Sequence, residues 1–173
     1  GRITVTEMMT ARARLVWNMQ FDATAGSGHS ASLDASVEDG GANLGFRPME
    51  LLLVGLAGCT AMDVISILRK KRQAVSHYDV HVSGVRAETH PMVFTEITVE
   101  HRLTGRDIAP EAVRRAIELS ESRYCGAGAM LGKTARLTHS FVIFVDDTPP
   151  PSRREIGARS EDDVRDPITV RGE

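Results

Sequence analysis

The sequence is poor in several features that would assign it to a function class. It has only two cysteines, aromatic residues make up 5% of it, and its formal net charge is -2. A chain this close to neutral gives no electrostatic reason to expect nucleic acid as a partner. No apolar segment followed by a small-residue cleavage site lies near the N-terminus, which predicts a cytoplasmic protein.

Long hydrophobic runs are also scarce. The uncharged apolar run from Leu51 to Met62 lies between Glu50 and Asp63. It is shorter than the roughly 20 residues that a helix needs to cross a bilayer. We therefore predict no association with a membrane.

The segment from Pro48 to Arg72 is expected to form the helix around which the fold is organised. Pro48 suits the first turn, and the segment ends in basic residues that suit the last turn. It is apolar on nearly all sides, which predicts a helix buried in a core. Cys59 lies near its middle.

Alternating apolar and polar residues predict the strands. Residues 11–21 and the short segment 30–36 indicate an antiparallel meander, and residues 77–88 and 93–105 indicate a hairpin. Residues 138–145 are nearly continuous in apolar side chains, which predicts a strand internal to a sheet.

We expect one domain, residues 11–146, between two terminal segments. Residues 1–10 are taken as an N-terminal extension or expression remnant. Residues 147–173 hold three consecutive prolines and many charges, so a flexible tail is expected. Within the domain, Pro110 opens a second helix, whose pattern breaks at Cys125.

The two cysteines are the first candidates for chemistry. Neither Cys59 nor Cys125 belongs to a CxxC motif, and their spacing does not suggest a metal, so we predict no metal site. Cys59 could equally be a buried thiol that acts as a small hydrophobic side chain. A pair of thiols brought together by the fold, one attacking and one resolving, is chemically coherent.

Three other side chains bear on the chemistry of these thiols. His29 follows a Gly-Ser-Gly turn that could hold its ring outward, whereas the remaining histidines are expected to be structural or on the surface. Glu50 lies in the first helical turn, where the helix dipole by itself favours a carboxylate. Asp63 shares the helix face of Cys59, and a carboxylate there would raise the pKa of a thiol.

Two cysteine-bearing segments carry a family resemblance. GFRPMELLLVGLAGCTAMDVISIL, then ELSESRYCGAGAML and THSF, resemble the OsmC/Ohr family of organic hydroperoxide reductases over about residues 11–145. The likeness is to the uncharacterised OsmC-like subgroup rather than to typical OsmC or Ohr proteins. It implies an α+β fold with antiparallel sheets around a long buried helix, in an intertwined homodimer.

The resemblance also implies an activity. Cys59 would attack a hydroperoxide, and Cys125 would resolve the sulfenic acid to a disulfide. The enzyme would need no cofactor beyond an external dithiol, lipoyl groups among them. The peroxidases place a glutamate directly after the helix-opening proline, where this chain has Met49, with Glu50 one position later.

The family's activating arginine is expected near the turn that holds His29, with Arg12, Arg14 and Arg47 as substitutes. These departures favour an alternative function, a small-molecule-binding protein of the same fold with weak or no peroxidase activity. A structural role with a vestigial site is a third hypothesis.

Overall fold

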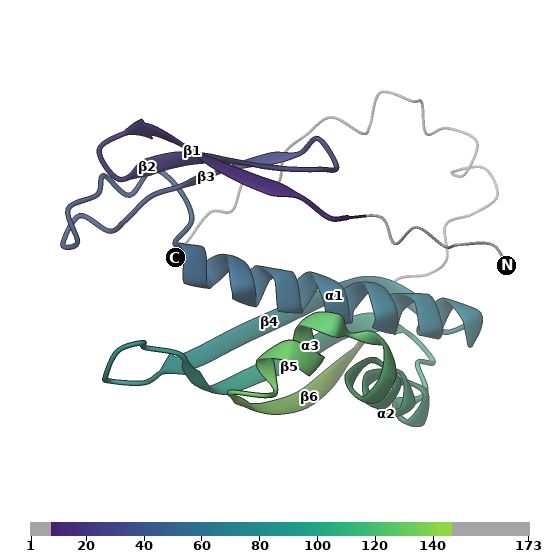
Figure 1. The fold of residues 1–173 in the computed structure, drawn as a ribbon. Helices are drawn as coiled ribbons and strands as arrows, with labels where there is room; N and C mark the ends of the chain where they lie inside the picture. The colour runs from purple at the N-terminus through teal and green to yellow at the C-terminus, as the bar shows by residue number, and fades with distance from the viewer. Residues whose placement is uncertain (1–7, 147–173) are drawn as a thin grey trace, which may run out of the picture.

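The first sheet of the computed structural model, which describes residues 8–146, is a three-stranded antiparallel meander (Figure 1). It consists of β1 (Ala11–Trp17), β2 (Gln20–Ala25) and β3 (Ser30–Leu33) in that order. The predicted meander is confirmed, but the single strand predicted over residues 11–21 is wrong. A tight turn at Asn18, whose φ is 47°, ends β1 and begins β2.

The predictions for residues 1–7 and for the tail 147–173 lie outside the described residues.

The loop from β3 to the central helix is ordered around Asp34. Its carboxylate accepts the backbone N–H groups of Ala35, Ala42 and Leu44 at 2.8 to 3.1 Å. These bonds, that of Leu44 foremost, lower the pKa of Asp34. These hydrogen bonds therefore fix the conformation of the loop that leads into α1 at Pro48.

The central helix, α1, spans Pro48–Lys70, close to the predicted bounds. Pro48 occupies its first turn, and the Glu50 carboxylate accepts the backbone N–H of Arg47 at 2.9 Å. The helix ends among basic residues, and Arg72 just beyond it has a φ of 56°. Local signals thus set both ends.

Burial of α1 on all sides, which the sequence predicts, is wrong for the described chain. The fully buried residues lie on one face, at intervals of one turn: Leu56, Thr60, Val64 and Leu68. Met62 is 73% exposed, and Leu52 and Val54 are about half exposed. The reason is that β4 and the helices after β5 cover only one face of α1.

By length and composition alone, α1 could cross a membrane, as the core helix of a soluble protein also could. The absence of membrane association stays a prediction.

The second sheet comprises β4 (Ala74–Arg86), β5 (Phe94–Arg106) and β6 (Arg136–Val145), in that order. The hairpin of β4 and β5 is antiparallel, as predicted. Strand β6 pairs with β5 in parallel and lies at the edge, so its predicted internal position is wrong. Its apolar run is explained by one face that packs inward, while Phe144 on the other face is 50% exposed.

Between β5 and β6 the chain forms α2 (Pro110–Leu119), a π-helical turn η1 (Ser120–Tyr124) and α3 (Gly126–Leu131). Figure 1 shows α1 between the two sheets, with α2 and α3 on the same side of the second sheet as α1. The helices therefore form one layer on that sheet, whereas the first sheet stands on the other side of α1.

The core beneath α1 consists of two apolar clusters. One gathers around Leu68 and Leu103, the other around Leu56 and Val99. Between them lies a polar layer: along α1, β5 and β6, one polar side chain separates a member of one cluster from a member of the other. The layer contains these side chains: Thr60, Tyr78, His101, Ser120 and His139.

Candidate thiol site

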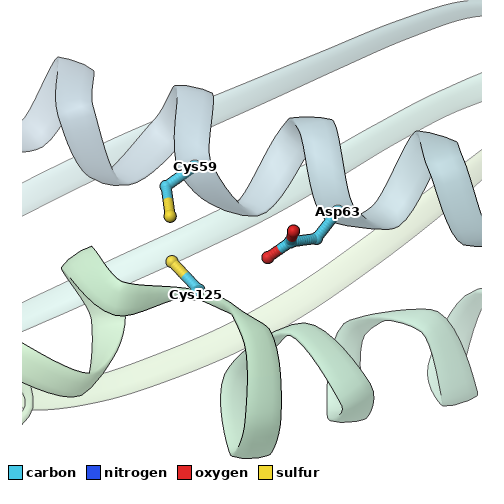
Figure 2. Close-up of side chains that lie close together, drawn as sticks. All are labelled: Cys59, Asp63 and Cys125. Atoms are coloured by element: carbon cyan, nitrogen blue, oxygen red, sulfur yellow. The ribbon is translucent and has the colours of Figure 1, made fainter. Parts of the chain in front are cut away.

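The fold brings the two cysteines together from distant parts of the chain. Cys59 projects from the middle of α1, and Cys125 lies between η1 and α3. Figure 2 shows the two sulfurs pointing toward each other, with the Asp63 carboxylate one turn further along α1 turned toward the same space. The nearest ligand atoms of the three side chains all lie within 4.8 Å of one another.

Cys125 owes its position to the break in the helix. The backbone leaves η1 and becomes extended at Cys125, which then caps α3, and its Sγ accepts the backbone N–H of Gly128 at 3.2 Å. A Cβ at Gly128 would lie 3.4 Å from that sulfur, at the short limit of ordinary van der Waals contact. The predicted junction at Cys125 is thus confirmed.

The two thiols differ in their surroundings. Cys125 is 4% exposed, whereas Cys59 is only partly buried. Burial, and to a lesser extent a hydrogen bond with Cys59, raise the pKa of Cys125 to about 11. At neutral pH Cys125 therefore keeps its proton.

Asp63 is held by the polar layer of the core. The Ser120 hydroxyl lies 2.9 Å from Asp63 Oδ2 and 3.2 Å from Thr60 Oγ1. A hydroxyl has a single proton, so Ser120 donates to the carboxylate and accepts from Thr60. Sequence reasoning placed Asp63 on the face of Cys59 but missed Ser120. The sequence did offer a signal: Ser120 directly follows the apolar stripe of α2, so its hydroxyl would be expected to be buried and to need a partner.

Glu50 and His29 lie elsewhere in the described chain. Glu50 caps α1, and the helical rise separates it from Cys59 by about 14 Å along the axis. His29 is exposed in the turn between β2 and β3, and its Nδ1 lies 3.1 Å from the Ser27 hydroxyl. A supporting role for either residue stays a prediction.

Two of the three arginines considered as activators, Arg14 and Arg47, have other partners. Arg12 and Arg14 line a polar hollow on the first sheet, where Arg14 lies 3.7 Å from Asp22. The Arg47 guanidinium donates to Gly45 O and to Asn43 Oδ1. Among residues 8–146, no arginine or lysine forms an ion pair with Asp63.

The polar layer also contains a stack of three rings. Tyr78 Oη lies 2.6 Å from His101 Nδ1, and His101 Nε2 lies 3.2 Å from His139 Nδ1. Burial lowers the pKa of His101 to about 4 and also lowers that of His139. His101 is fully buried and bonded on both ring nitrogens, and a structural role for it stays a prediction.

Comparison with known proteins gives one consistent family. A profile described as OsmC-like protein matches residues 40–140. Protein YhfA of Escherichia coli (strain K12) is 38% identical over 135 residues, which cover 78% of this chain and 98% of YhfA.

Solved structures agree. A hypothetical protein from Aquifex aeolicus VF5 superposes with a TM-score of 0.72 and 28% identity, covering 82% of this chain and 100% of that one. The organic hydroperoxide resistance protein OhrB of Bacillus subtilis shares the fold at a TM-score of 0.55 and 14% identity, with coverages of 79% and 98%.

The similarity is thus higher to YhfA and to an uncharacterised structure than to OhrB, which confirms the predicted subgroup. Two small sheets, a long central helix and two apposed cysteines are found together here. The chain belongs to the OsmC-like protein family.

Proposed function

We propose that this protein is a thiol-dependent hydroperoxide reductase in which Cys59 attacks the peroxide and Cys125 resolves the product. The observation that carries the proposal is the apposition of the two sulfurs, which come from α1 and from the start of α3. The distant likeness to an organic hydroperoxide resistance protein supports the choice of substrate.

The difference between the two thiols assigns their roles. Cys59 is the more accessible thiol, so a peroxide reaches it first. Cys125 is almost fully buried, and burial together with a hydrogen bond to Cys59 raises its pKa, so it keeps its proton at neutral pH. Buried Cys125 is then the partner in the second step.

The reaction balances in two steps. The Cys59 thiolate attacks one peroxide oxygen and the O–O bond breaks, so that Cys59 becomes a sulfenic acid and the alkoxide leaves as an alcohol after taking up a proton. The Cys125 sulfur then attacks the Cys59 sulfur, expelling water and forming a disulfide. An external dithiol, for which a lipoyl group is a candidate, returns both cysteines to thiols by exchange.

The proposal includes a homodimer. Apolar side chains remain exposed on α1 and on the first sheet, among them Met62 on α1 and Trp17 on β1. A second copy would cover them and would supply the N-terminal strands next to the thiols. Sedimentation analysis tests this: a dimer that Met62→Glu dissociates is expected, and a monomeric wild type contradicts it.

The activity test compares three proteins. Consumption of an alkyl hydroperoxide in the presence of dihydrolipoamide, with a chelator added, is measured for the wild type, Cys59→Ser and Cys125→Ser. We expect turnover in the wild type and background rates in both variants. Cys125→Ser should still form a sulfenic acid at Cys59, which dimedone traps.

Ser122→Ala is the matched control, because Ser122 is exposed on η1 and donates only to Glu118 O. Its rate should equal that of the wild type. Equal background rates in the wild type and Cys59→Ser would refute the proposed reaction.

One observation favours the alternative, a binding protein with weak peroxidase activity. A reactive thiolate is usually stabilised by a nearby cation, but Asp63 is the charged side chain beside these thiols in the described chain. Native mass spectrometry of the purified protein checks this alternative. A co-purified small molecule together with slow peroxide turnover would support it.

A further inference from the structure

The thiol site contains a third group that the proposed reaction does not use. An oxygen of the Asp63 carboxylate and the sulfurs of Cys59 and Cys125 all lie within 4.8 Å of one another. As Figure 2 shows, all three side chains point into that space from two elements. Two thiols and a carboxylate are three groups that become anionic ligands on losing protons.

The charge balance of this cluster favours a cation. Within the described part of the chain, neither arginine nor lysine pairs with Asp63. A bound divalent ion would displace the thiol protons and compensate all three negative charges at once.

The spacing suits one metal in particular. Zinc binds cysteine sulfur at about 2.3 Å in tetrahedral geometry, which places two ligating sulfurs roughly 3.8 Å apart. Side chains already within 4.8 Å reach that arrangement by small rotations. Thiolate ligands select zinc over magnesium or calcium, which prefer oxygen.

The neighbouring groups orient the ligands as they do in metal sites. The Ser120 hydroxyl donates to Asp63 Oδ2, which fixes the carboxylate while its other oxygen stays available. The Gly128 N–H donates to the Cys125 sulfur, which stabilises its negative charge. Both donors come from the segment around Cys125, opposite α1.

We infer that Cys59, Asp63 and Cys125 form a zinc site in the reduced protein, with a water molecule as the fourth ligand. The inference departs from the sequence prediction of no metal, because that prediction relied on ligand spacing along one stretch of chain. Here the ligands come from two elements that meet only in the folded protein. The site does not require the proposed peroxidase activity.

The experiment measures zinc binding by the reduced protein. The chain is reduced with a phosphine, stripped of metal, and titrated with Zn²⁺ against a chromophoric chelator, with the bound metal counted by elemental analysis. We expect one zinc per chain, and an affinity lower by about 10-fold or more in Cys59→Ser and in Asp63→Asn. Ser120→Ala should lower it by about 10-fold through the freed carboxylate.

Glu88→Gln is the matched control, since it removes a carboxylate that is exposed in the loop after β4. Its affinity should equal that of the wild type. Substoichiometric zinc in the wild type, or equal affinity in Cys59→Ser, would overturn the inference.

A second measurement uses the wild type alone, so it does not depend on the folding of any variant. Zn²⁺ should slow the alkylation of both cysteines by iodoacetamide, and it should raise the melting temperature of the reduced protein. Unchanged alkylation under saturating Zn²⁺ would also overturn the inference. Because the peroxidase assay contains a chelator, the two proposals fail separately.

Discussion

The two sheets of this chain differ in how they are covered. In β5 alternate residues are fully buried beneath α1, among them Val99 and Leu103, whereas every residue of β1 is exposed. The second sheet has a core of its own within one chain. The first sheet is held by its strand pairing and by the loop after β3, and its apolar side chains Leu15, Val16 and Trp17 are exposed in the described chain. Within the described chain, the buried core therefore belongs to the second sheet, whereas the exposed apolar side chains of β1 belong to the first.

The largest effect is expected in the core of the second sheet. Leu103→Ala should lower the free energy of unfolding by about 3 kcal/mol, because Leu103 is fully buried among Val64, Leu68 and Val113 and leaves a cavity. Urea denaturation followed by circular dichroism measures the change. A loss below about 1 kcal/mol would mean that this cluster is less tightly packed than described.

The second effect concerns the ring stack and pH. The pKa of His101 is about 4 in the folded protein, whereas an unfolded histidine titrates near 6.5. Between these values the unfolded chain binds the proton and the folded one does not. The contribution of His101 to the free energy of unfolding is therefore fully present above pH 6.5. It is lost as the pH falls toward 4, which lowers that free energy by up to about 3 kcal/mol.

Urea midpoints measured across pH 4 to 7 test this expectation. The slope should decrease in His101→Gln, and the part that remains is assigned to His139, whose pKa burial also lowers. It should persist in His81→Gln, because His81 is exposed on the opposite face of the second sheet. A slope unchanged in His101→Gln would assign the pH dependence to other groups.

A smaller effect is expected where the polar layer meets the thiol site. Ser120→Ala removes the buried donor to Asp63 and should cost about 1 to 2 kcal/mol. Thermal melts of this variant and of Ser122→Ala, whose hydroxyl is exposed, give the comparison directly. Equal melting temperatures would show that water replaces Ser120 without cost.

The smallest effect is expected in the first sheet. Leu15 in β1 is 57% exposed, so Leu15→Ala should change the stability of an isolated chain by no more than about 0.5 kcal/mol. Denaturation at low and at high protein concentration provides the measurement. A loss that grows with concentration would show that a second copy covers this sheet.

Local signals predicted several elements well. Pro48 and the basic residues after Leu68 set the ends of α1, and Pro110 opens α2, because helix termini depend on neighbouring residues. The turn at Asn18 was missed, since an alternating pattern continues through it. The edge position of β6 was also missed, because an apolar run says nothing about which strand lies beside it.

The sequence by itself determined the family, the helices, the hairpin and the two cysteines as candidates for chemistry. Tertiary structure decided which face of α1 is buried, because that depends on where β4 and α2 pack. It also decided that Asp63 and Ser120 join the thiols. The distances from Asp63 and Ser120 to the thiols depend on how α1 packs against the segment around Cys125. The separation of these residues along the sequence does not predict that packing.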